Sequence, residues 1–495
     1  MLALLAQSAL FFVISRIGAD AVDSGFVKWS HQPIGKRALA SYSHTAWCPP
    51  RVLAGQQQGH KQQPITTLRT KTRDMETDLA LTKQITLPVA VVNLIKACTG
   101  AGCMCLSGTA SSSGTGLGSS LAIYLITALG CAWSFSMVGL ACEAAERNGA
   151  LRGSDVSDFR NVWSAIIGHR SSFVVDVFQV LYATLCCACY LPTLHAFMVP
   201  ALLALGVPQT ITALPLKLGL AVVLIGLSRL RNLKDVAPIS ALGVAGFVCT
   251  CAMVIWRSLD GSYALLGPFS FSTSITQQPS FWALGPASFS LYLASTFSLS
   301  AHYSAPRFYG QLQRRSGRRF QILSGSGFVF LAATYMLLNI GTFATFGGVV
   351  QAPLINSYAT GDPLALACRC LFLIALLGIY PLVFMAIWDP MARLLATARS
   401  AMWRGSVARE FISLEGAVGL VSVAVVATSL CIRNIGSAYV KAGAITSPAF
   451  CWIFPGMLAL SAGKRWGYRN HSQGVLCRAA IVWGSVQAVL GILLS

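Results

Sequence analysis

Eleven apolar runs between residue 86 and the end of the chain restrict its fold more than any other sequence feature. Many of them reach the roughly 20 residues that a helix needs to cross a bilayer. Only 11% of the residues are charged, against about 25% in soluble proteins. The sequence therefore predicts an all-α, multi-pass membrane protein. We expect its spans at about residues 86–110, 119–142, 172–196, 211–228, 236–256, 282–305, 322–346, 363–388, 411–431, 437–461 and 475–495.

The distribution of basic residues supports this number of spans. Nineteen Lys and Arg residues lie in the loops after spans 2, 4, 6, 8 and 10, whereas the opposite loops hold little beyond Arg257 and Arg433. Because basic loops stay on the cytosolic side, the N-terminus is predicted to be cytosolic and the C-terminus external. Short basic clusters between apolar runs also argue against nucleic-acid binding, in spite of a net charge of +20.

Residues 1–84 differ from the rest of the chain and are predicted to form a cytosolic, mostly disordered tail before a transmembrane domain at 85–495. The stretch 25–84 is rich in Gln, Thr, Lys and Arg. Met1–Ile14 is apolar but too short to span a membrane. A short targeting segment over residues 1–21 is one interpretation, although no basic residue precedes the apolar stretch; a non-essential N-terminus is the other.

Two of the spans carry signals that interrupt a helix. Span 1 has Thr99, Gly100 and Gly102 near its midpoint, and span 6 combines hydroxyl residues with His302 and Pro306. Close helix–helix contact through small residues would also explain the glycines. However, the two breaks lie five spans apart, so they fall in helices of opposite direction, as two inverted five-helix repeats would give. Paired interrupted helices of this kind indicate a transporter site at the middle of the membrane.

At these residues the chain resembles the amino acid/auxin permease family, whose members include neutral and vacuolar amino acid transporters. The residues that carry the resemblance are Asn93-Leu94-Ile95-Lys96, Gly100, Gly102 and Leu106 in span 1; Phe297, His302, Pro306, Tyr309 and Leu312 in span 6; Tyr380-Pro381-Leu382 in span 8; and Arg433-Asn434-Ile435-Gly436, Gly443 and Pro455 in span 10. The resemblance implies eleven spans, a LeuT-type 5+5 inverted repeat with helices 1 and 6 interrupted, and coupled transport of amino acids.

The interrupted helices supply the candidate substrate site. We expect backbone amides around the first break to bind a substrate carboxylate, and side chains around the second to line the pocket. The candidate residues are Thr99, Gly100, Ala101, Gly102, Cys103, Phe297, Ser298 and Ser300.

Two features argue against coupling to sodium, which prefers oxygen ligands. Span 8 contains no Ser or Thr between Leu364 and Leu395. Lys96 stands where sodium-coupled relatives have Asn, and its ammonium would repel sodium. Proton coupling or exchange remains.

Three ionisable residues within spans are candidates for coupling or gating, because charge inside a membrane is costly. Lys96 could carry a coupling charge or extend to the cytosolic face. Asp176 could relay a proton, pair with Lys96 or sit at the interface. His302 could relay a proton, although a gate or structural role is favoured. Arg369 and Lys441 are expected to be interfacial.

Other classes of protein remain possible. A membrane enzyme is disfavoured because no cluster of His, Asp and Glu marks one membrane face. A nutrient sensor with a transporter fold, a channel, or a carrier of another small solute stays open. Cys186, Cys187 and Cys189 lack a neighbouring His or carboxylate at ligand spacing, so we predict no metal there and no cofactor. Whether the protein resides in the plasma membrane or in a vacuolar or other internal membrane cannot be read from the sequence.

Overall fold

The computed structural model describes residues 84–230, 237–264, 266–269, 280–402, 413–467 and 471–494. The predicted tail and its targeting segment lie outside this range, apart from Gln84, and both stay predictions. The described residues belong to one unit, Lys83–Ser495, and the following account concerns that unit alone.

Helices occupy all eleven predicted spans, which we number in chain order. They are span 1, α3 (Leu87–Cys98) with α4 (Ala101–Ser112); span 2, α5 (Leu117–Arg147); span 3, α7 (Phe173–Ala204); span 4, α9 (Leu214–Leu227); span 5, α10 (Ala237–Leu259); span 6, α11 (Ser288–Ser298) with α12 (Ala305–Gln311); span 7, α13 (Gly317–Phe346); span 8, α14 (Pro363–Met385) with α15 (Trp388–Met402); span 9, α16 (Leu414–Cys431); span 10, α17 (Ile435–Ser447) with α18 (Phe454–Trp466); and span 11, α19 (His471–Leu494). Short helices α6 (Phe159–Ile166) and α8 (Gln209–Thr212) lie between spans.

Length and composition qualify most of these elements as membrane spans. Within the described ranges, eight helical segments are long and apolar enough to cross a bilayer, and the bent pair α3–α4 is a ninth if it counts as one span. The two remaining spans are α10, whose stretch Ala245–Leu259 counts as a shorter apolar helix, and the pair α11–α12, which is interrupted between Ser298 and Ala305.

Local sequence explains where several spans begin. Asp362 accepts hydrogen bonds from the first backbone amides of α14, and Pro363 follows it at the first helical position. Ser316, Ser413 and Asn434 cap α13, α16 and α17 in the same way. Side-chain oxygens at these positions satisfy amides that a helix leaves unpaired at its start.

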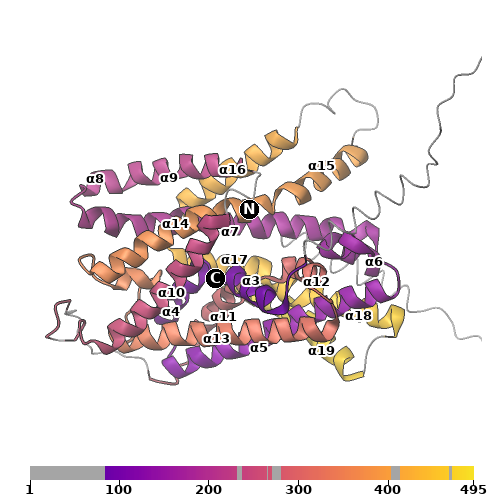
Figure 1. Ribbon diagram of the computed structural model, residues 1–495, viewed down its shortest axis with the longest axis horizontal. Helices are drawn as coiled ribbons and strands as arrows, with labels where there is room; N and C mark the ends of the chain where they lie inside the picture. Colours follow the sequence, from indigo (N-terminus) through magenta and orange to yellow (C-terminus); the bar gives the residue numbers. More distant parts are fainter. Residues whose placement is uncertain are drawn as a thin grey trace, which may run out of the picture. The chain divides into compact units, whose positions relative to one another are not determined.

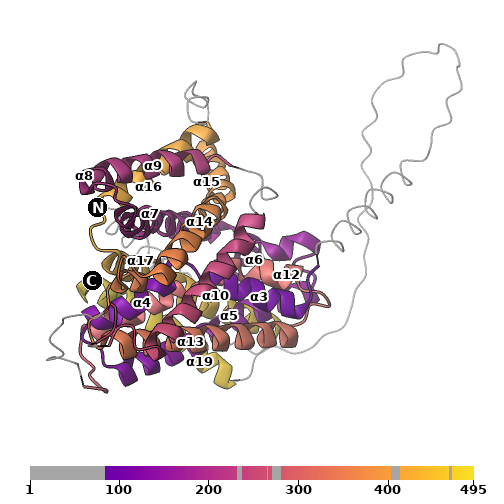
Figure 2. The same cartoon turned by 60° about the vertical axis from the view of Figure 1, so that its left-hand side comes forward.

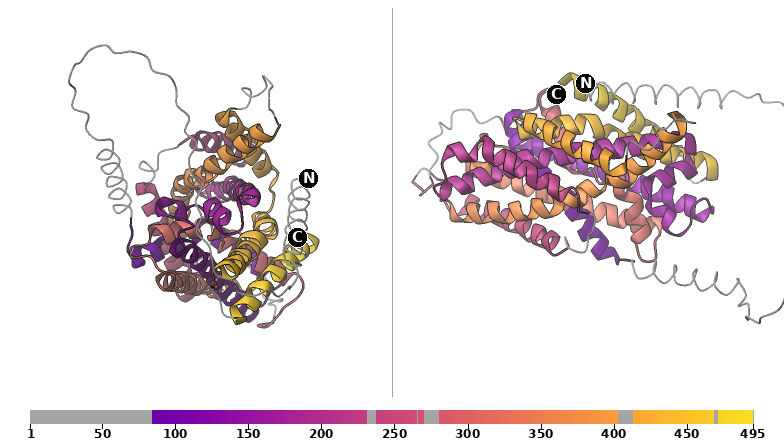
Figure 3. Two further views of the ribbon diagram at one scale, coloured as in Figure 1. Left: turned by 90° about the vertical axis from the view of Figure 1, so that its right-hand side faces the viewer. Right: turned by 90° about the horizontal axis from the view of Figure 1, so that it is seen from above.

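The outer helices present apolar side chains to their surroundings. On α9 and α16, Val222 and Leu420 are 70% and 72% exposed, and Val423 is also exposed. Figure 2 shows α9 and α16 side by side at one edge of the bundle, and the left view of Figure 3 looks along many of the helices. A surface of this kind is stable in lipid rather than in water.

The predicted interruptions are present. Span 1 bends by 53° between α3 and α4, at Thr99 and Gly100. In span 6, α11 ends at Ser298 and α12 begins at Ala305, with a short 3₁₀ turn, η4 (His302–Ser304), before it. Figure 1 places α4, α11 and α17 between α7 and α14 on one side and α5 and α13 on the other, and α4, α11 and α17 contact one another.

Span 10 carries an irregularity that the sequence did not predict. Between α17 and α18 the chain forms a π-helical segment, η7 (Pro448–Ile453), all of whose residues are buried. Wider turns of this kind are rare and often occur at functional sites. Span 10 is therefore continuous but locally distorted. The distortion lies beside the break in span 6, because η7 contacts η4.

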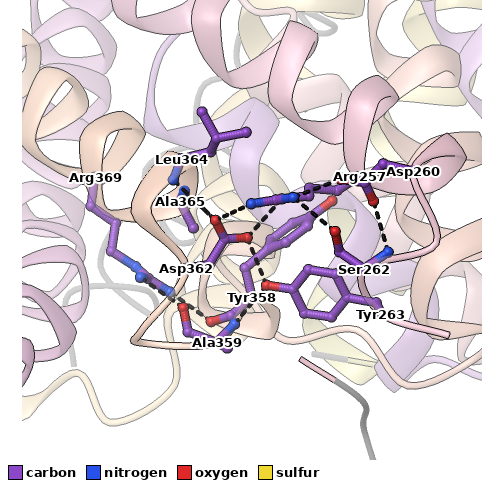
Figure 4. Close-up of polar contacts among 10 residues, drawn as sticks. All are labelled: Arg257, Asp260, Ser262, Tyr263, Tyr358, Ala359, Asp362, Leu364, Ala365 and Arg369. Atoms are coloured by element: carbon purple, nitrogen blue, oxygen red, sulfur yellow. Dashed lines mark hydrogen bonds and ion pairs between the residues drawn. The ribbon is translucent and has the colours of Figure 1, made fainter. Parts of the chain in front are cut away.

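A buried polar network joins the end of α10 to the start of α14 (Figure 4). Arg257 donates two hydrogen bonds to Asp362, at 2.9 Å from Nε and 2.6 Å from Nη2, and a third to Asp260. Tyr263 donates to Asp362 at 2.9 Å. Burial opposes ionisation of Asp362, but the hydrogen bonds from Arg257 and Tyr263 outweigh it and hold the pKa of this carboxyl below its usual value.

Arg369 corrects one expectation. We expected it at the membrane interface, but its side chain is fully buried. Its guanidinium donates to the carbonyls of Tyr358 and Ala359 in the loop before α14 (Figure 4), and to that of Ile355 in the 3₁₀ turn η5 (Leu354–Ser357). These hydrogen bonds offset the cost of burying the charge.

Candidate functional site

A cavity of about 90 Å³ lies where the two broken helices meet. Residues from spans 1, 3, 6, 8 and 10 surround it. They are Ala97, Cys98, Gly100, Ala101, Gly102, Tyr182, Cys186, Tyr190, Phe297, Ser298, Tyr303, Val383 and Tyr439. The two interruptions predicted from the sequence are therefore brought together around one space, as a shared binding site requires.

Five of the eight residues predicted to bind substrate line this cavity: Gly100, Ala101, Gly102, Phe297 and Ser298. The glycine at position 102 permits a close approach of span 1 to span 6. A Cβ atom there would lie 2.6 Å from the Ser298 hydroxyl oxygen and 3.2 Å from the Tyr439 ring. Because Gly102 has no side chain, span 1 can pack closely against span 6 and span 10.

The other three predicted residues are buried beside the cavity but do not line it. The Thr99 hydroxyl donates to the Lys96 carbonyl, and the Cys103 thiol donates to the Gly100 carbonyl at 2.9 Å. The backbone carbonyl of Ser300 accepts a hydrogen bond of 2.7 Å from the Tyr182 hydroxyl. Thr99 and Cys103 thus form hydrogen bonds within span 1, and the backbone of Ser300 joins the break of span 6 to α7.

The broken helices direct their ends at the cavity. α4 begins at Ala101, after Gly100, and no side chain caps its first amides. The start of a helix carries a partial positive charge, which favours an anionic group. α3 and α11 end at Cys98 and Ser298, both at the cavity wall, and helix ends carry partial negative charge. Helix ends therefore give the site a partially positive and a partially negative side, although no ionised side chain lines it.

Tyrosines are four of the eight remaining lining residues, and sequence reasoning missed all four. Tyr182, Tyr190, Tyr303 and Tyr439 line the cavity together with Phe297. The Phe297 ring lies 5.5 Å from the ring of Tyr182 and 5.7 Å from that of Tyr439, both edge-on. These distances are typical of favourable aromatic pairs.

A signal for part of this wall was present in the sequence. Tyr182, Cys186 and Tyr190 are spaced four residues apart and therefore lie on one face of a helix. All three line the cavity. The periodicity alone could not show that this face turns toward spans 1 and 6 rather than toward lipid.

The coupling and gating candidates lie apart from one another. Lys96 is half-buried in the last turn of α3, where a helix end favours a cation. His302 is fully buried in η4, and its Nε2 atom lies 2.8 Å from the Ser134 hydroxyl of α5. Neither lines the cavity.

Asp176 belongs to an ionic network near the start of α7. Its fully buried carboxylate accepts hydrogen bonds from Arg160 of α6 and, at 2.7 and 3.0 Å, from Arg393 of α15. Arg393 also contacts Asp158 at 3.2 Å. Among the described residues, its partners are these two arginines and not Lys96, whose pairing with Asp176 we had considered.

The arrangement of the helices and the paired interruptions define a fold, the LeuT type. Two solved transporters of this fold are similar to the chain. Mhp1 in its inward-facing conformation gives a TM-score of 0.52 at 10% identity, over 83% of this chain and 88% of Mhp1. MhsT in complex with L-phenylalanine gives a TM-score of 0.49 at 15% identity, over 81% of this chain and 98% of MhsT. The similarity to Mhp1 concerns the fold alone and confirms the predicted fold class.

The family follows from the sequence comparison. A family model described as transmembrane amino acid transporter protein matches residues 83–486, and the chain belongs to this family. The family is one of transporters and not of enzymes. Solute carrier family 38 member 8 of Homo sapiens is 26% identical over 216 residues, which cover 42% of this chain and 48% of that protein. The match thus spans about half the length of this curated relative.

Proposed function

We propose that this protein is a secondary transporter that carries neutral amino acids across a membrane. The observation that supports this function is the cavity between the broken halves of spans 1 and 6, where oppositely polarised helix ends meet an aromatic wall. A zwitterion matches those two ends, because it carries one anionic and one cationic group close together. The family to which the chain belongs supports the same class of substrate.

The substrate carboxylate is proposed to bind at the start of α4. The amides of Ala101, Gly102 and Cys103 lie in the first turn and have no carbonyl partners within the helix. The substrate ammonium is proposed to face the carbonyl ends of α3 and α11. Backbone groups are suited to this task because they recognise what all amino acids share and leave the side chain to the rest of the cavity.

The selectivity for neutral substrates is proposed from the cavity wall. None of the thirteen residues around it is Asp, Glu, Lys, Arg or His. A charged substrate side chain would therefore lose its hydration without gaining a counter-ion, which is costly in a buried site. Apolar and aromatic side chains would instead contact the rings of Tyr182, Phe297 and Tyr439.

The coupling is proposed to be to protons, or the transport to be exchange, rather than sodium symport. Span 8 has no Ser or Thr between Leu364 and Leu395, and Val383 is its residue at the cavity. Lys96 places a cation in the last turn of α3. A hard cation such as sodium needs several oxygen ligands, and span 8 lacks the hydroxyls of Ser and Thr from Leu364 to Leu395. The positive charge of Lys96 would in addition repel the ion. A sensor with little flux, or a carrier of another small solute, is the alternative.

Uptake into proteoliposomes tests this proposal. Labelled neutral, acidic and basic amino acids are offered under an inward proton gradient, with and without sodium. We expect saturable uptake of neutral amino acids that does not depend on sodium, and loss of that uptake with a protonophore if protons are coupled. Persistence of counterflow under the protonophore would indicate exchange.

A pair of matched variants ties the uptake to the cavity. Gly102→Ala places a Cβ atom 2.6 Å from the Ser298 hydroxyl and should reduce uptake, whereas Gly219→Ala has no neighbour within 4 Å and should not. Absence of uptake of every amino acid by folded protein would refute the transport function and favour the sensor or another solute.

A further inference from the structure

Two thiols and an imidazole meet in the membrane domain, apart from the residues that line the cavity. Cys131 comes from α5, His302 from the 3₁₀ turn in the break of span 6, and Cys451 from the π-helical segment of span 10. One ligand atom of each lies within 4.8 Å of those of the other two. All three residues are fully buried. Residues 320 positions apart in sequence are thus combined into one cluster of metal-ligating atoms.

The hydrogen bonds around His302 leave the correct nitrogen free to bind a cation. Its Nε2 atom lies 2.8 Å from the Ser134 hydroxyl oxygen and 3.2 Å from the Cys131 carbonyl. Because the Ser134 hydroxyl donates to the same carbonyl, both neighbours accept from Nε2 and fix the hydrogen there. Nδ1 then presents its lone pair toward Cys451, whose sulfur is 3.5 Å away. Metal-binding histidines usually donate their second ring nitrogen in this manner.

We propose that Cys131, His302 and Cys451 bind one zinc ion. Two cysteines and a histidine are typical zinc ligands, and zinc takes four of them in a tetrahedron. The Ser300 hydroxyl, 3.5 Å from the Cys451 sulfur, lies in reach of the fourth position. In binding, Zn²⁺ replaces the hydrogens of the two thiols, and two protons are released.

The balance of charge favours Zn²⁺ over the monovalent cation Cu⁺. Two thiolates and a neutral imidazole carry a charge of −2, so Zn²⁺ makes the site neutral and Cu⁺ would leave it at −1. An uncompensated charge in a dry protein interior is costly. The surroundings offer no counter-ion at this distance: the hydrogen-bond partners described for the three residues are serine hydroxyls and backbone carbonyls.

The position of the site gives the ion a structural consequence. Bound zinc would connect α5 and η7 to the break of span 6, whose residues Leu299–Ala301 lie outside any helix. Three separate elements would then be tied at the segment that interrupts the helix. This inference does not depend on the proposed transport function, since binding of the ion can be measured without it.

Metal analysis of the full-length protein tests the site. The protein is purified in detergent without chelators, through an affinity tag free of histidine, and is then incubated with Zn²⁺ and desalted. We expect about one zinc per chain in the wild type. In competition with a chromophoric chelator, Cys131→Ser and Cys451→Ser should each weaken zinc binding by at least about 10-fold, since loss even of a residue that orients a ligand has such an effect.

Cys142→Ser is the matched control, because Cys142 is a fully buried cysteine of the same helix α5 and is not part of the cluster. It should bind zinc as the wild type does. Equal zinc binding by the wild type and both cluster variants would overturn the proposal, as would a wild type that retains no zinc.

X-ray absorption at the zinc edge identifies the atoms bound to the ion. It uses the wild type alone, so the test does not depend on the folding of a variant. The proposal requires two sulfur atoms at about 2.3 Å and lighter ligands at about 2.0–2.1 Å. A coordination shell of nitrogen and oxygen only would assign the ion to another place and refute the site.

Discussion

Replacement of Gly443 by alanine is a sharp test of how spans 6 and 10 meet. An added Cβ atom at this position would lie 2.3 Å from the Leu293 carbonyl oxygen and 3.3 Å from the Phe297 Cβ atom. The first of these contacts is with backbone, which no rotation of a side chain can relieve. α11 and α17 must therefore separate by on the order of 1 Å, since nonbonded heavy atoms approach to about 3.5 Å at best.

Two opposing contributions set the magnitude of the effect. Alanine is favoured over glycine within a helix by about 1 kcal/mol. Inserting a methyl group into a closely packed interior costs about 1–3 kcal/mol, and more where backbone has to move. Because the clash is with backbone, the upper end of this cost applies, and we expect net destabilisation by about 2 kcal/mol. Phe297 would also shift within the cavity wall, and a loss of about 1.4 kcal/mol in substrate binding corresponds to a tenfold weaker affinity.

Thermal unfolding in detergent and concentration-dependent uptake measure the two effects. Gly219→Ala is the control, because this glycine lies on α9, exposed and without any neighbour within 4 Å of an added Cβ atom. It should unfold at the same temperature as the wild type or slightly above it. If Gly443→Ala matched this control in both unfolding temperature and apparent affinity, α11 and α17 would not be in the close contact described.

Three further predictions concern the ionic networks. Asp362→Ala leaves the Arg257 guanidinium without its main partner and should cost about 3 kcal/mol. We expect it to unfold at a lower temperature than Asp362→Asn, which keeps one oxygen acceptor. Because the folded-state pKa of Asp362 lies below its usual value of about 3.9, its stabilising contribution is complete above that pH and is lost as the pH falls through the folded-state pKa. The unfolding temperatures of wild type and Asp362→Asn should therefore keep a constant difference from pH 7 to 5 and converge below about pH 4. Arg393→Gln leaves Asp176 with Arg160 alone and should lower the unfolding temperature, and Asp176→Asn should restore part of the loss; strictly additive losses in the double variant would show that the pair is not coupled.

The eleven spans and both interruptions could be predicted because their signals are local. A helix that crosses a membrane needs an apolar run of fixed length, and this requirement is written into consecutive residues. The breaks likewise follow from short stretches such as Thr99–Gly102, where glycine removes the preference for a helix. The π-helical segment Pro448–Ile453 escaped prediction because no single residue type demands it.

The candidate site was predicted only in part, because its composition depends on which helices face each other. Helical spacing groups Tyr182 with Tyr190 on one face but does not orient that face. The partners of Asp176 show the same limit: Arg160 is 16 residues away and Arg393 is 217. We predicted Arg369 at the membrane surface because the backbone carbonyls that accept its hydrogen bonds leave no pattern in the sequence.

Tyr335 of span 7 connects the two interruptions that define the site. Its hydroxyl donates a hydrogen bond of 2.9 Å to the Cys98 carbonyl, at the end of α3, and lies 3.5 Å from the Ser298 carbonyl, at the end of α11. The second distance is long for a hydrogen bond, so the Tyr335 hydroxyl donates to the Cys98 carbonyl of α3 and only lies near the Ser298 carbonyl of α11. A single hydroxyl donates one hydrogen, and the Ser298 carbonyl is therefore left to accept from another group. Ser298 lines the cavity. Under the proposed function, the ammonium of an amino acid would donate to this carbonyl and join the ends of both broken helices.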